Sequence, residues 1–304
     1  MQAQTQSKAD EVHGGRAPAT WRAVFAVFKL RIGVVISLTA MAGIAVQPGA
    51  ALSFAQVAAV FLAVLFASAS AGAFNQYYEV DLDHRMRRTR ARPFATGRLK
   101  AHRGWLLPIA ALTVAGVALA WLAANALSAL FTFLGAFFYA IVYTVWLKRR
   151  TWWNIVIGGL AGSFGVLAGA AAASPELSPQ ALLLATILFL WTPPHFWSLA
   201  TAVHKDYAAA SAPMLPVVEG VAPAARAIFA HVVALVALSL LLPLWGAGIV
   251  YTIGALGGGA WFIARAWTLL REPTTAHARL AFRASLVQLS VLLFGAMLDA
   301  SLRL

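Results

Sequence analysis

The sequence predicts an all-α polytopic membrane protein with nine transmembrane helices. Two observations support this fold class: hydrophobic residues make up 61% of the 304 residues, and charged residues make up only 11%, which is far from a soluble composition. The formal net charge of +13 does not indicate a nucleic-acid-binding protein, because the basic residues lie in short segments between apolar runs. With no cysteine, disulfides and thiol catalysis are excluded.

Runs of about 20 apolar residues define the expected spans. Residues 1–24 form a polar N-terminal tail, expected on the cytoplasmic side, and 25–304 form a single nine-helix domain. The first run is too long for a signal-peptide core, so we expect it to remain as the first span. The expected helices lie near 25–46, 53–78, 105–124, 127–147, 154–173, 179–200, 224–243, 248–268 and 281–301.

The distribution of lysine and arginine gives an independent test of the helix count. With nine spans, every basic residue except Arg303 falls on one side of the membrane. Because lysine and arginine collect on the cytoplasmic side, we expect a cytoplasmic N-terminus and a periplasmic C-terminus. The compact loops favour a bacterial inner membrane.

The most polar stretch of the chain, Asn75 to Pro93, follows the second apolar run and reads NQYYEVDLDHRMRRTRARP. At about 100° per residue, Asn75, Glu79 and Asp83 fall on one helical face. Asp81 lies on the opposite face and is given a lesser role. Amide and carboxylate oxygens are the hard ligands that Mg²⁺ prefers, so these three residues are candidate metal ligands and catalytic residues.

Arginines follow the acidic face directly, and guanidinium groups match phosphate oxygens. Hard oxygen ligands next to arginines are typical of a magnesium diphosphate site. The candidate diphosphate ligands are Arg88 and Arg92, together with Lys148, Arg149 and Lys205 from later segments on the same membrane side. The alternative is that these cations only fix the membrane orientation.

A second polar segment runs from Trp191 to Val218, on the same side of the membrane as the first. Its Pro193-Pro194 pair is expected to kink or restart the sixth helix. Asp206 is a candidate fourth Mg²⁺ ligand. His195 lies deeper and is a candidate functional group, as an iron ligand, a proton carrier or a hydrogen-bond donor; alternatively, it only bonds a neighbouring helix.

These motifs resemble the protoheme IX farnesyltransferases (heme O synthases), a branch of the UbiA-type intramembrane prenyltransferases. The resemblance is carried by N-x-x-x-E-x-x-x-D-x-x-M-x-R-T-x-x-R-P at Asn75 to Pro93, T-P-P-H-F-W at Thr192 to Trp197, and K-D-Y at Lys205 to Tyr207. It implies a UbiA-type bundle with a cytoplasmic-side cavity, in which Asn75, Glu79, Asp83 and Asp206 hold Mg²⁺ and the prenyl diphosphate. One departure is Ala210, where the wider superfamily usually has a second aspartate.

The reaction that the resemblance implies is transfer of a farnesyl group from farnesyl diphosphate to a vinyl group of heme B, with addition of water. The product, heme O, serves terminal oxidase biogenesis, which makes a heme A synthase or a terminal oxidase a candidate partner. His195 then becomes the candidate heme contact. The alternatives are a prenyltransferase acting on a quinone precursor or another tetrapyrrole, which the T-P-P-H-F-W motif disfavours, and a non-catalytic transporter or assembly protein.

Overall fold

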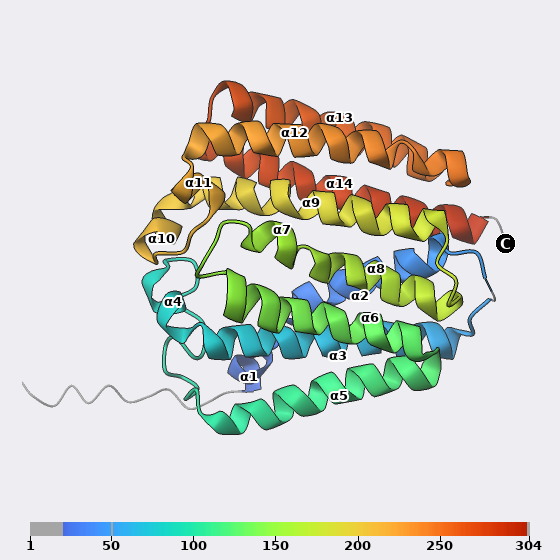
Figure 1. The fold of residues 1–304 in the computed structure, drawn as a ribbon, viewed down its shortest axis with the longest axis horizontal. Coiled ribbons are helices and arrows are strands. Elements are labelled where there is room, and N and C mark those ends of the chain that lie inside the picture. Colours follow the sequence, from blue (N-terminus) through green and yellow to red (C-terminus); the bar gives the residue numbers. More distant parts are fainter. Residues whose placement is uncertain (1–20, 50, 303–304) are drawn as a thin grey trace, which may run out of the picture.

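The structure, a computed structural model, describes residues 21–49 and 51–302. Most of the predicted tail, and Arg303, therefore lie outside the described residues. Within them the chain is a bundle of long helices whose axes run along the longest dimension of the molecule (Figure 1). No strand occurs in this part of the chain.

The long helices confirm the predicted fold class. In the described part of the chain, eight helices are long and apolar enough to cross a membrane, and a bent pair at the start raises the number to nine. The spans are α1 (Trp21–Val27) with α2 (Leu30–Val46), α3 (Phe54–Tyr78), α5 (Leu106–Ala123), α6 (Ala126–Phe137) with η2 (Phe138–Leu147), α7 (Asn154–Gly158) with α8 (Leu160–Ala173), α9 (Pro179–Ala202), α12 (Val221–Ser239) with η3 (Leu242–Trp245), α13 (Ile249–Arg271) and α14 (Thr275–Leu302).

Some spans differ from the sequence prediction in detail. The first bends by 44° between α1 and α2, and α14 begins at Thr275, six residues before the expected start at 281. Helix α9 runs unbroken through Pro193 and Pro194, so the helix does not restart there. The two prolines lack the N–H groups that would bond the carbonyls of Phe189 and Leu190, four residues earlier, and the surrounding helices of a bundle make such a loss tolerable within a span.

The centre of the bundle is held by small residues that let backbones approach closely. Helices α2 and α8 meet at Gly43 and Gly169, both buried. A Cβ added at Gly169 would overlap the backbone carbonyl of Ala40, and one at Gly43 would overlap that of Val166. This contact leaves no room for any side chain at either position.

The two ends of the bundle are built differently. At one end the connections are long and contain the short helices α4 (Val80–Arg85), α10 (His204–Ala209) and α11 (Leu215–Val218), which all lie at this end of the bundle (Figure 1). At the other end the turns are tight. There Asp299, near the end of α14, accepts hydrogen bonds from the first backbone N–H groups of α13, at Val250 and Tyr251 (3.1 and 2.9 Å). The polar sequence motifs therefore all gather at the first end.

Candidate active site

The acidic motif forms one continuous face, as its spacing predicts. Helix α3 ends at Tyr78 and α4 begins at Val80, but the helical hydrogen bonds continue across the junction. The Glu79 N–H donates to the Asn75 carbonyl (3.1 Å), and the Asp83 N–H donates to the Glu79 carbonyl (2.8 Å). Asn75, Glu79 and Asp83 are therefore aligned, and each is at most 2% exposed. The Asp81 side chain, by contrast, is 53% exposed.

Each residue of this face is paired with one cation from a different segment. Lys29 Nζ donates to Asn75 Oδ1 at 2.6 Å, and Lys148 Nζ donates to Glu79 Oε2 at 2.5 Å. Arg92 Nη1 lies 2.8 Å from both oxygens of Asp83. We call these six residues the buried polar cluster. Because charged groups are expensive to bury without partners, the cluster is held in place by these reciprocal contacts.

Lys29 is a site residue that the sequence reasoning missed. From the sequence it counts only as one of the basic residues at the start of the first span, which orient the protein in the membrane. In the structure it occupies the bend between α1 and α2 in a left-handed backbone conformation (φ 50°, ψ 41°), which is uncommon for a residue with a side chain. Its Nζ also donates to the Tyr139 hydroxyl at 3.1 Å. The signal available was a lysine placed inside an otherwise apolar run.

The predicted diphosphate ligands divide into two groups. Arg92 and Lys148 belong to the buried polar cluster. Arg149 instead makes a two-pronged ion pair with Asp81 at the surface, with contacts of 2.8 and 2.7 Å. These hydrogen bonds lower the pKa of Asp81. The structure thus holds Arg149 outside the cluster, next to the acidic residue that was given the lesser role.

Arg88 and Lys205 line a neighbouring open cavity of about 600 Å³. Its walls carry five basic side chains and one carboxylate; we call it the basic cleft. It is formed by α10, the start of α14 and the loop after α4. Its charged residues are Arg87, Arg88, Arg90, Lys205, Asp206 and Arg279.

Asp206 lies in the basic cleft and not in the buried polar cluster. It stands on α10, separated from α9 by the break at Val203. Among the described residues no group of three His, Cys, Asp or Glu side chains converges as a metal-binding set. The structure therefore aligns three of the four predicted Mg²⁺ ligands and places the fourth in the adjacent basic cleft, which we call the mouth of the site. There Arg88 donates to the Tyr207 hydroxyl at 3.5 Å.

The chemistry of the cluster fits a magnesium ion. Asn75, Glu79 and Asp83 offer only oxygen donors, which are the ligands of Mg²⁺. Glu79 Oε1 is buried and has no hydrogen-bond partner in the described part of the chain. A buried carboxylate oxygen without a partner is costly, so a hard cation is a chemically matched partner for it.

His195 belongs to α9, and its side chain contacts α14. Its ring stacks on Trp191 (centroids 4.2 Å apart) and lies 4.7 Å from the ring of Phe282. Nδ1 is 2.7 Å from Ser285 Oγ, so Nε2 is the ring nitrogen left to contact another molecule. The side chain thus bonds a neighbouring helix through Nδ1 and keeps Nε2 available for a ligand.

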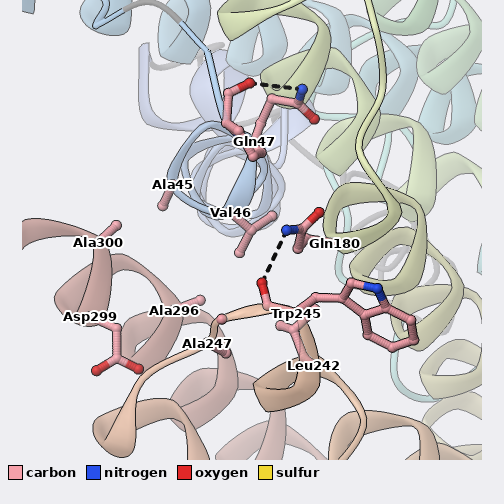
Figure 2. Close-up of a pocket in the computed structure, with 12 residues that line it drawn as sticks. Ala45, Val46, Gln47, Gln180, Leu242, Trp245, Ala247, Ala296, Asp299 and Ala300 are labelled. Carbon is pink, nitrogen blue, oxygen red and sulfur yellow. Dashed lines mark hydrogen bonds between the residues drawn. The ribbon is translucent and has the colours of Figure 1, made fainter. Parts of the chain in front are cut away.

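A second cavity, of about 240 Å³, lies at the opposite end of the bundle (Figure 2). Gln47 and Gln180 line it, together with Asp299. Gln47 donates to the backbone carbonyl of Glu176 at 2.8 Å and Gln180 to that of Trp245 at 3.0 Å, while Asp299 is bound to α13 as described above. These polar groups hold the ends of helices together, far from the acidic motif.

The described residues thus form a bundle of up to nine spans with a buried acidic face and basic partners at one end. The sequence matches the UbiA prenyltransferase family over residues 36–292, and the chain belongs to that family.

Sequence relatives and solved structures agree with this assignment. The chain is 58% identical to protoheme IX farnesyltransferase 2 of Paramagnetospirillum magneticum over 92% of this chain and 98% of that protein, and 43% identical to protoheme IX farnesyltransferase 1 of the same organism over 92% and 99%. The fold is similar to digeranylgeranylglyceryl phosphate synthase (TM-score 0.75, 18% identity, 92% and 98% covered). It is also similar to a UbiA homologue from Archaeoglobus fulgidus bound to DMAPP and Mg²⁺ (TM-score 0.65, 15% identity, 88% and 99% covered).

Proposed function

We propose that this protein transfers the farnesyl group of farnesyl diphosphate to a vinyl group of heme B, with addition of water, to make heme O. The observation that carries the proposal is the buried polar cluster, which combines aligned oxygen ligands with cations suited to a diphosphate. The similarity to protoheme IX farnesyltransferases over nearly the whole chain supports farnesyl as the donor and heme B as the acceptor.

The residues of the cluster account for the departure of the diphosphate. Asn75, Glu79 and Asp83, with Asp206 at the mouth, would hold Mg²⁺, which when bound supplies Lewis-acid stabilisation of the leaving group. Arg92 and Lys148 donate to diphosphate oxygens from inside the cluster, and Arg88 and Lys205 donate from the mouth. Arg149 completes the basic rim in this proposal once it exchanges Asp81 for the substrate. Fixed cations in a water-poor site stabilise charge as it develops.

The proposed reaction consumes farnesyl diphosphate, heme B and one water molecule. The bond between C1 of the farnesyl group and the diphosphate oxygen breaks, and the diphosphate keeps the electron pair. The π electrons of the heme vinyl group form the new carbon–carbon bond to C1. Water captures the resulting cation beside the porphyrin and loses a proton, which leaves the hydroxyl group of the product. The rings of Tyr139 and Tyr143, stacked 5.9 Å apart, lie next to the cluster, where they shield the allylic cation from early capture by water.

The proposal also includes the orientation of the protein in the membrane. The end that carries the cluster would face the cytoplasm of a bacterium, because basic residues collect on that side, and the C-terminus would be periplasmic. A heme A synthase or a terminal oxidase would then receive the product. A quinone precursor or another tetrapyrrole is the alternative acceptor within the same fold.

His195 is proposed to contact the heme. We expect His195→Ala to lower the affinity for heme B about 10-fold, a loss typical of one good polar contact, and to leave the affinity for farnesyl thiodiphosphate with Mg²⁺ unchanged. Titration of heme absorbance in the purified protein measures the first, and calorimetry the second. Ser285→Ala is the matched control, because it removes the partner of Nδ1 and keeps Nε2. Unchanged heme affinity in His195→Ala would contradict this role.

Mass spectrometry of extracted hemes tests the proposed function directly. Cells that produce the protein are expected to contain a heme of the farnesylated and hydroxylated mass, and cells that produce Asp83→Asn are expected to lack it. Unchanged heme B beside a newly farnesylated quinone would keep the prenyl transfer and replace the acceptor. The absence of any new prenylated compound would refute the catalytic proposal.

A further inference from the structure

The basic cleft carries five basic side chains and one carboxylate. Among the described residues, none of its five basic side chains lies within ion-pair distance of a carboxylate, although Asp206 shares the same cavity. The buried polar cluster meanwhile has cations of its own for the diphosphate. Unpaired like charges around one cavity repel each other and favour an anionic ligand.

The basic cleft touches the end of α9, the helix that carries His195, and the start of α14. Ala202 lines the cavity and lies seven residues beyond His195, so the two residues share a helical face and are separated by about 10 Å along the axis. On α14, Arg279 lines the cavity and Phe282, one turn further, contacts the His195 ring. The same two helices, α9 and α14, therefore carry both the wall of the basic cleft and the aromatic side chains around His195.

We propose that three arginines of the basic cleft bind the two propionate carboxylates of the tetrapyrrole acceptor. These arginines are Arg87, Arg90 and Arg279. This inference rests on the proposed function, because it assumes that the acceptor is heme B. A flat apolar macrocycle with carboxylates on one edge matches a group of cations that stands about two helical turns from the aromatic side chains around His195. Guanidinium groups bind carboxylates with two parallel hydrogen bonds.

In this assignment the diphosphate and the propionates, both anionic, are bound by different sets of cations. The diphosphate is held at the buried polar cluster and by Arg88 and Lys205 on its side of the mouth. The propionates are held by the three remaining arginines, of which Arg279 comes from α14 and the other two from the loop after α4. The vinyl groups, on the part of the macrocycle away from the propionates, then point into the bundle, where the allylic cation forms.

Binding of heme B and of its dimethyl ester to the protein in phosphatidylcholine nanodiscs tests this assignment. The ester keeps the macrocycle and removes both negative charges. The wild-type protein is expected to bind the diacid at least 10-fold more tightly than the ester. The double variant Arg90→Gln, Arg279→Gln is expected to lose about 10-fold in affinity for the diacid, the effect of two partly solvated charged contacts, and to bind the ester unchanged.

The control is the double variant Arg98→Gln, Arg103→Gln. It removes the same charge from exposed residues of the connection that also carries Arg90, outside the residues that line the cleft, and should keep the preference for the diacid. Farnesyl thiodiphosphate with Mg²⁺ should bind equally well to all three proteins.

Several outcomes would overturn the inference. Equal losses for diacid and ester would show that the arginines act on the fold. Loss of farnesyl thiodiphosphate binding alone would assign the cleft to the diphosphate, and loss of binding to vesicles of phosphatidylglycerol alone would assign it to lipid headgroups. A variant Arg90→Gln, Arg279→Gln that keeps the preference for the diacid would refute the role of these arginines. A wild-type protein that binds neither form of heme would instead refute the proposed acceptor.

Discussion

Replacement of Glu79 by Gln, or of Asp83 by Asn, is expected to lower kcat/KM for farnesyl transfer by about 10³-fold, the upper range for loss of one electrostatic contact in a site of this kind. Each substitution keeps the size of the side chain and removes the charge that would bind Mg²⁺. Each also leaves a cation of the cluster, Lys148 or Arg92, without its charged partner. Steady-state rates of the purified variants with farnesyl diphosphate and heme B measure the effect.

Asp81→Asn is the matched control for this prediction. Asp81 lies in the same six-residue helix as Asp83 but pairs with Arg149 at the surface, where an ion pair contributes little to stability. We expect its rate to stay within about 5-fold of the wild type, since a contact worth less than 1 kcal/mol changes a rate by less than about 5-fold. Comparable losses in all three variants would contradict the assignment of roles by helical face.

Replacement of Gly169 by Ala is expected to destabilise the bundle strongly. The added methyl group would overlap the Ala40 carbonyl, which is backbone and cannot move aside as a side chain can. Helices α2 and α8 would have to separate, with a cost of roughly 1–3 kcal/mol or more, as for other overpacked sites. Thermal unfolding in detergent, followed by intrinsic tryptophan fluorescence, should show a clearly lower midpoint than the wild type.

Gly257→Ala is the control, because it makes the same chemical change on an exposed position of α13. A Cβ there meets no atom within 4 Å, and alanine is favoured over glycine in a helix by up to about 1 kcal/mol. The midpoint of this variant should equal or exceed that of the wild type. An unchanged midpoint in Gly169→Ala would show that α2 and α8 can separate at no cost.

The spans and the acidic face could be predicted from the sequence because both depend on local periodicity. Apolar runs of membrane-spanning length locate the helices, and the four-residue spacing of Asn75, Glu79 and Asp83 requires only that the backbone continue as a helix, which it does across the junction of α3 and α4. The far side assigned to Asp81 follows from the same rule.

The partners of that face could not be predicted, because they depend on how separate segments meet. Lys29 and Lys148 are 46 and 69 residues from the side chains they contact, and no spacing rule connects them. Arg149 follows Lys148 directly but faces the opposite way, so one of two adjacent cations enters the cluster and the other does not. Whether Arg149 or Asp206 binds substrate stays a prediction.

The π-helix η2, Phe138–Leu147, gives the fourth span an unusual property. Here the backbone bonds reach five residues back, and the Lys148 N–H donates to the Tyr143 carbonyl at 2.9 Å. Such a segment holds more residues than an α-helix of equal length. The 100° per residue of an α-helix therefore does not apply across η2, and α-helical spacing continued from α6 would place Lys148 on a different side of the helix axis from the one that faces Glu79. In this span the number of residues, and not only their identity, determines which side chain reaches the acidic face.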